Sequence, residues 1–311
     1  MPSSPAFRAS RLTPSTFVIQ EYADSYDEHP LIYAKICAEI ATLVIIDTGC
    51  GGATKDLDID LKSLRKFIEA VPVEDNNGEP LNKGSEMRYV VVLSHCHYDH
   101  ILGVEEFAKD SQILASGHSS TFLDPDNLPA HSLCKFLDIP VPSYKPILVP
   151  HEHPVRMNNG DNKEGLNPWT GLRILHTPGH TPDELAVWDS GEHMLYVGDT
   201  LYEWAPIIFP AEGSITTWIK SVDELLELIS GEGTKEVKVS CGHVTAARPA
   251  REVITGAKTF IVDVLEGREP VRRRSEKRGE AFVEYVQDDH RFSLGCPERL
   301  VQEAQQALTR L

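Results

Sequence analysis

Residues 95–100 read HCHYDH, and only Ser94 separates them from the apolar run YVVVL at residues 89–93. A run without polar residues is typical of a strand that is covered on both faces. The hexapeptide then lies at the carboxyl end of that strand, which is where α/β sheets place their chemistry. Its three imidazoles and one carboxylate are the nitrogen and oxygen ligands that divalent metal ions accept, so the hexapeptide predicts a metal site.

Three further units have the same form, in which a polar residue follows a short apolar strand. They read LRILHTPGH, HMLYVGD and VKVSCGH, and they end at His180, Asp199 and His243. Each one alone is weak, because a single His or a Gly-Asp pair after a strand is usually an ordinary polar turn. Together, and in this order, they supply what the hexapeptide lacks for a site with two metal ions.

The order and spacing of these units resemble the metallo-β-lactamase-fold superfamily, from about Asp47 to His243. The resemblance implies an α/β fold, namely an αββα sandwich of two packed mixed sheets flanked by helices. It also favours one domain, although 311 residues alone would allow two. We therefore expect a single domain over residues 1–311, with a lid-like insertion near residues 119–150 and a helical C-terminal extension.

The resemblance also implies a ligand set. The expected ligands are His95, His97 and His180 for the first ion, Asp99, His100 and His243 for the second, and Asp199 as a bridge between both. A bridging Asp is typical of the lactonase, thioesterase and glyoxalase members, whereas the antibiotic-resistance members have a Cys there. Asp47 is expected to orient a ligand histidine without touching a metal. Two Zn²⁺ per chain are expected, and iron or manganese would also accept these ligands.

Two ions that share a hydroxide and polarise a carbonyl group favour hydrolysis as the reaction. Asp99 is then placed to pass a proton to the leaving atom. The Tyr202 hydroxyl resembles the oxyanion donor of lactonase-like relatives, and simple packing of Tyr202 and Trp204 in the pocket wall is the alternative.

Apolar residues in the 119–150 segment, together with Trp204, Ile207, Ile208 and Phe209, favour a small and mostly apolar substrate. We expect the enzyme to open a lactam or lactone ring of a xenobiotic or a secondary metabolite, as in detoxification. Segments outside the motifs resemble fungal members that act on benzoxazolinones as γ-lactamases. A glyoxalase-II-like thioesterase, a mononuclear-iron oxidoreductase and a metal-free scaffold stay open as alternatives.

The charge balance opposes a nucleic-acid partner, because 47 acidic against 30 basic residues give a net charge of -17. We interpret the basic run from Arg272 to Arg278 as a solvated helix face. Six cysteines without a CxxC pair, and a first segment without the apolar core of a signal peptide, predict a soluble cytoplasmic protein. No run approaches the roughly 20 apolar residues of a membrane span. The oligomeric state is left open, with a homodimer as one alternative.

Overall fold

The computed structural model describes residues 4–119, 121–158 and 167–309. The chain divides into two compact units. The first comprises Met1–Ile174 and Asp189–Glu192, and the second comprises Leu175–Trp188 and His193–Leu311. The expectation of one domain over residues 1–311 stays a prediction, and its two ends and residue 120 lie outside the described residues.

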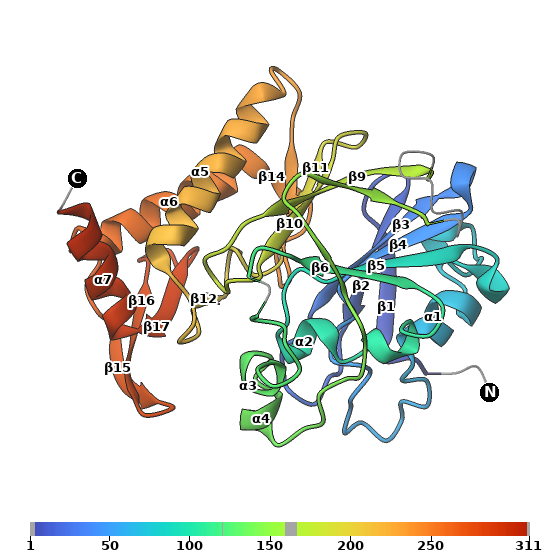
Figure 1. Cartoon of the computed structure of the whole chain (residues 1–311), viewed down its shortest axis with the longest axis horizontal. Coiled ribbons are helices and arrows are strands. Elements are labelled where there is room, and N and C mark those ends of the chain that lie inside the picture. Colours follow the sequence, from blue (N-terminus) through green and yellow to red (C-terminus); the bar gives the residue numbers. More distant parts are fainter. Residues whose placement is uncertain (1–3, 120, 159–166, 310–311) are drawn as a thin grey trace. The chain divides into compact units, whose positions relative to one another are not determined.

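The first unit is built on a seven-stranded mixed sheet whose spatial order follows the chain (Figure 1). Its strands are β1 (Phe7–Arg11), β2 (Thr16–Glu21), β3 (Leu31–Cys37), β4 (Thr42–Ile46), β5 (Arg88–Val92), β6 (Gln112–Ser116) and β7 (Ile147–Val149). Strands β1 to β4 are antiparallel neighbours, and β4 to β7 are parallel. Strand β5 lies between two parallel partners and is buried from Tyr89 to Val92, as its apolar sequence predicts.

Short helices and a strand pair complete the first unit. The helical segments are η1 (Ala38–Ile40), α1 (Leu64–Ala70), η2 (Glu74–Asn76), η3 (Lys83–Ser85), α2 (Tyr98–Ile101), η4 (Val104–Glu106), α3 (Leu128–His131) and α4 (Cys134–Leu137). Strand β8 (His153–Arg156) pairs antiparallel with β9 (Trp169–His176), which continues into the second unit. Helix α1 begins after Ser63, whose side chain accepts a hydrogen bond from the Lys66 N–H and so caps the helix.

The segment near residues 119–150 contributes to the core of the first unit. Phe122, Leu123 and Leu128 are buried and pack with Cys96 and Ala115. The segment also supplies α3, α4 and the edge strand β7. These contacts give its apolar residues a structural role, and a lid function stays a prediction.

The second unit contains two groups of strands. The first group has the spatial order β14 (Arg248–Pro249), β13 (Lys238–Ser240), β11 (Met194–Tyr196) and β10 (Leu185–Asp189), and the next strand in this order is β9. A four-stranded sheet has the order β12 (Pro206–Ile208), β17 (Ser293–Pro297), β16 (Glu280–Val286) and β15 (Arg273–Lys277). Mixed sheets with helices confirm the predicted α/β class.

The second unit has three long helices, α5 (Ile215–Gly231), α6 (Ala250–Leu265) and α7 (Glu298–Leu308) (Figure 1). Buried side chains of all three helices belong to one apolar core. Trp218, Phe260 and Phe292 are among the fully buried side chains of this core. Within the described residues, no helix has both the length and the apolar character that a membrane crossing requires.

The C-terminal part of the chain is only partly helical, since β15, β16 and β17 lie between α6 and α7. The interpretation of the basic run as a helix face is wrong, although Arg273 and Arg274 are exposed as expected. Lys277 pairs with Glu280, so only Arg278 and Gly279 lie between β15 and β16. Both have positive φ, 54° and 80°, which is the backbone of a two-residue hairpin turn. The dense charges of the run obscure this turn signal.

Replacing Gly279 by Ala is expected to destabilise the protein by about 1 kcal/mol, because a Cβ atom disfavours the left-handed backbone. A Cβ at Gly279 would meet no atom within 4 Å, so the cost would come from the backbone alone. Gly231→Ala is the matched control, since Gly231 ends α5 and also has no atom within 4 Å. Urea unfolding measures both variants, and equal stability of the two would contradict the assigned turn.

Candidate functional site

Four of the expected ligands follow β5 within a single short segment. β5 ends at Val92, and α2 begins at Tyr98 with His97 as its N-cap. The side chains in question are all buried, with exposed fractions of 1% for His95, 6% for His97, 5% for Asp99 and 0% for His100. Burial of four polar side chains is costly in free energy unless they interact closely with one another or with a ligand.

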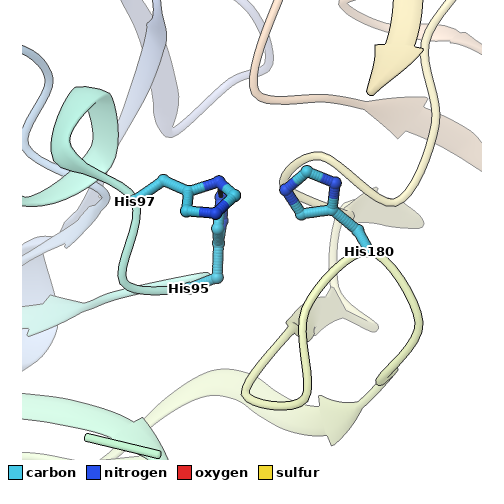
Figure 2. A group of neighbouring side chains, drawn as sticks. All are labelled: His95, His97 and His180. Atoms are coloured by element: carbon cyan, nitrogen blue, oxygen red, sulfur yellow. Dashed lines mark hydrogen bonds between the residues drawn. The ribbon is translucent and has the colours of Figure 1, made fainter. Parts of the chain in front are cut away.

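His95 and His97 lie with their rings edge to face. The Nε2 atom of His95 is 3.0 Å from the Nδ1 atom of His97, and Figure 2 shows that the two rings meet. Two nitrogen atoms that bind one zinc ion at about 2.0 Å in tetrahedral geometry are themselves about 3.3 Å apart. The two imidazoles therefore fit a shared divalent ion.

His100 has a carboxylate near each ring nitrogen. Its Nδ1 atom is 2.9 Å from Asp47 Oδ2, and its Nε2 atom is 3.4 Å from Asp99 Oδ2. A carboxylate on Nδ1 fixes the ring orientation and directs Nε2, the nitrogen that would bind a metal, away from Asp47. The predicted contact between Asp47 and one of the expected ligand histidines is confirmed, and metal binding by His100 stays a prediction.

Asp47 also fixes the start of the ligand segment. Its carboxylate accepts hydrogen bonds from the Ser94 N–H at 2.7 Å and from the Ser94 hydroxyl at 2.8 Å. The N–H and the hydroxyl of Thr48 both donate to the His100 carbonyl, at 2.8 and 2.9 Å. The ends of β4 and β5 and the short helix α2 are thus joined around one carboxylate.

Glu21, at the end of β2, supports the loop that follows Asp47. Its buried carboxylate accepts hydrogen bonds from the N–H groups of Cys50 and Gly52, at 2.7 and 2.8 Å. Burial raises the pKa of Glu21 to about 8. Sequence reasoning missed this residue, because a single Glu at a strand end is not distinguishable from a surface residue.

The second unit presents the other three expected ligands on three separate loops. His180, Asp199 and His243 are buried, with exposed fractions of 2%, 6% and 7%. The Asp199 and His243 loops are joined by a hydrogen bond from the Gly242 N–H to the Gly198 carbonyl. Asp199 Oδ2 lies 3.5 Å from His243 Nε2, so these two expected ligand atoms are close neighbours.

Trp218 of α5 holds the loops of His180 and Asp199 together. Its indole N–H donates to the carbonyl of Thr200, and its backbone lies directly against Gly179. A Cβ atom at Gly179 would be 2.5 Å from the Cα of Trp218, so only glycine fits before His180, whose loop is drawn in Figure 2. The motif residues therefore depend on a helix that comes later in the chain.

Glu184 supports the same region, because its Oε1 atom accepts a hydrogen bond from the Asp199 N–H at 3.0 Å. Neither Glu184 nor Trp218 could be found from sequence reasoning, since neither stands in a motif. Asp183 is buried as well.

Tyr202 and Trp204 differ sharply in their placement. The ring of Tyr202 is 5% exposed and lies edge to face with the ring of His243, with 5.6 Å between centroids. Trp204 is 58% exposed. Tyr202 therefore lies beside an expected ligand, and its catalytic role stays a prediction.

The donor chemistry fits divalent metals in both units. His95, His97, Asp99 and His100 gather in the first unit, and Asp199 and His243 gather in the second. All are imidazole nitrogens or carboxylate oxygens, which suit zinc, iron and manganese. The complete set of seven ligands stays a prediction.

Comparisons with known proteins agree with this interpretation of the chain. The family model of the metallo-beta-lactamase superfamily matches residues 40–235, a range that contains six of the seven expected ligands and ends before His243. "Putative transcription factor avaE" of Aspergillus versicolor is 32% identical over 307 residues, with 96% of this chain and 88% of that protein covered. "Acyl-coenzyme A thioesterase MBLAC2" of Gallus gallus is 25% identical over 205 residues, with 62% and 69% covered.

A solved structure shows the same fold. The metallo-beta-lactamase family protein TTHA1429 from Thermus thermophilus superimposes with a TM-score of 0.56 at 18% identity, with 83% of this chain and 82% of that chain covered. Members of the superfamily are generally hydrolases that bind metal ions. Because the family model matches more than half of the chain, the chain belongs to the metallo-beta-lactamase superfamily.

Proposed function

We propose that the protein is a metal-dependent hydrolase that opens the lactam or lactone ring of a small, mostly apolar molecule. The observation that carries the proposal is the buried segment from His95 to His100, whose imidazoles and carboxylate lie close together and whose His100 ring is oriented by Asp47. Structural histidines rarely gather at such density, and a carboxylate that accepts the far ring N–H of a histidine is the usual arrangement at metal sites.

The proposed ligand set comprises all seven residues. His95, His97 and His180 would hold one ion, Asp99, His100 and His243 would hold the other, and Asp199 would contact both. When bound, two divalent ions polarise a carbonyl group and lower the pKa of water to near neutrality. Zinc is the proposed metal, with iron or manganese as the alternatives that metal analysis separates.

Two side chains are proposed to act on the substrate. The Asp99 carboxylate would hold a proton and pass it to the leaving nitrogen or oxygen atom of the ring. The Tyr202 hydroxyl would donate a hydrogen bond to the carbonyl oxygen as negative charge develops there. The edge-to-face contact with His243 supports this placement of Tyr202.

Thioester hydrolysis is the second candidate, because the matched MBLAC2 protein is named an acyl-coenzyme A thioesterase. Coenzyme A carries phosphate groups, which basic side chains would have to bind. The basic run is the clearest cluster for this, but Arg272 and Arg274 are already paired with Asp288 and Glu298, at 2.5 and 2.9 Å. This pairing favours a neutral ring as the substrate.

We do not propose DNA binding, although the avaE protein is named as a transcription factor. The net charge of -17 would repel a phosphate backbone over most of the surface. A small molecule is the proposed partner, with neither nucleic acid nor membrane. A cytoplasmic location stays an expectation, and a homodimer stays one alternative for the oligomeric state.

Metal content and hydrolysis test the proposed function together. Protein purified without added metal is expected to hold about two zinc ions per chain by mass spectrometry and to open rings in a panel of lactones, lactams and acyl thioesters. Asp199→Ala is expected to lose metal and most turnover, because the proposed shared ligand is gone. Thioester cleavage alone would support the second candidate. Full metal content and activity in Asp199→Ala would contradict the proposed site.

The Asp47 contact predicts a loss of metal affinity in Asp47→Asn. The amide would not accept the proton of His100 Nδ1 as a carboxylate does, and loss of such a partner typically lowers metal affinity by about 10- to 100-fold. Competition with a chelator measures the affinity. Asp138→Asn is the control, since Asp138 also has positive φ but is exposed. Unchanged affinity in Asp47→Asn would show that His100 does not bind metal.

Tyr202→Phe tests the proposed hydroxyl donor. We expect kcat to fall by about 100-fold, the usual effect of removing one oxyanion donor, while the metal content stays unchanged. Tyr285→Phe removes another buried phenol of the second unit and is expected to keep full activity. Equal kcat in Tyr202→Phe and the wild type would leave Tyr202 with a packing role only.

A further inference from the structure

Two exposed apolar side chains lie on the loops that carry Tyr202 and His243. Trp204 is 58% exposed and Val244 is 56% exposed. Val244 follows His243 directly, and Trp204 is two residues beyond Tyr202. Single exposed apolar residues are common on protein surfaces. Two of them on the loops of a candidate site, however, raise the question of what they bind.

The backbone at both residues is strained. Trp204 has a φ of 66° and Val244 a φ of 53°, a region that large or β-branched side chains rarely adopt. Strain of this kind costs free energy and is concentrated at ligand-binding and catalytic sites. Val244 is the clearer outlier of the two residues, because its branched Cβ crowds the carbonyl group.

Hydrogen bonds and ion pairs around the buried Glu203 fix the two loops to each other. The Glu203 N–H donates to the Thr245 hydroxyl at 2.8 Å, which joins the loop of Trp204 to the loop of Val244. The Glu203 carboxylate is fully buried and binds Arg248 at 3.1 Å and Arg291 at 2.8 Å. The Trp204 N–H donates to the Arg291 carbonyl. The positions of both apolar residues are therefore determined by firm contacts.

We propose that Trp204 and Val244 form an apolar surface that binds the alkyl or aromatic group of the substrate next to His243. This inference rests on the proposed function and assigns its specificity. The indole and isopropyl groups carry no charge, so they would distinguish substrates by the apolar area that is buried. Glu203 acts as a positioning residue for this surface.

Binding can be measured without hydrolysis by using ω-bromooctanamide, an uncharged apolar probe whose bromine quenches nearby tryptophans. Trp204 and Trp169 are the exposed tryptophans among the described residues, and Trp169 lies on β9. We expect saturable quenching in the wild type and in the control variant Trp169→Ala. Val244→Ala, which keeps Trp204, should bind the probe at least about fivefold more weakly, since two methyl groups are removed.

Absence of saturable quenching in the wild type, its loss in Trp169→Ala, or unchanged binding in Val244→Ala would each overturn the inference. These outcomes do not depend on turnover, so they are distinct from a failure of the proposed function.

Hydrolysis of lactones with side chains of increasing length supplies the second test. Trp204→Ala is expected to lose at least about tenfold in kcat/KM for a long alkyl chain and little for the unsubstituted ring, with metal content unchanged. Trp204→Phe should restore most of the preference. An equal loss for both substrates would indicate a merely structural role and would overturn the inference while leaving the proposed function intact.

Discussion

The carboxylate of Asp47 is the contact on which the ligand segment of the first unit depends. It lies at the end of β4, binds the backbone and hydroxyl of Ser94 at the end of β5, and orients His100 of α2. A buried carboxylate is costly unless several donors surround it, and here three donors do so. The contacts that stabilise the buried Asp47 carboxylate also determine the orientation of the His100 imidazole.

The second unit fixes its ligands by other means. Its three loops are held by backbone hydrogen bonds and by the packing of Trp218 against Gly179. Glu184 adds one hydrogen bond to the Asp199 N–H. Each unit therefore restrains its own donors through contacts that need no metal, which reduces the ordering that metal binding would otherwise require.

The strand ends and their ligands could be predicted because their signals are local. A buried strand such as β5 is visible in its apolar run, and the polar residues follow at once. Glu21, Trp218 and Glu203 could not be predicted, because their roles come from residues far away in the chain. The strands after α6 were missed for a different reason. The charged residues from Arg272 to Arg278 resemble the exposed face of a helix. The turn signal of Arg278 and Gly279 is only two residues long and is weaker than this charge pattern.

Charge bears on the choice between the two substrate classes. Acyl-coenzyme A brings several negative charges, and this chain carries a net charge of -17, with Arg248, Arg272, Arg274 and Arg291 each paired with a carboxylate. Long-range repulsion would slow the approach of such an anion, whereas a neutral lactam or lactone meets no such barrier. The exposed side chains of Trp204 and Val244 also favour a neutral substrate, because they can bury the apolar area of a ligand and carry no charge to pair with an anion. Both arguments favour a neutral, apolar ring.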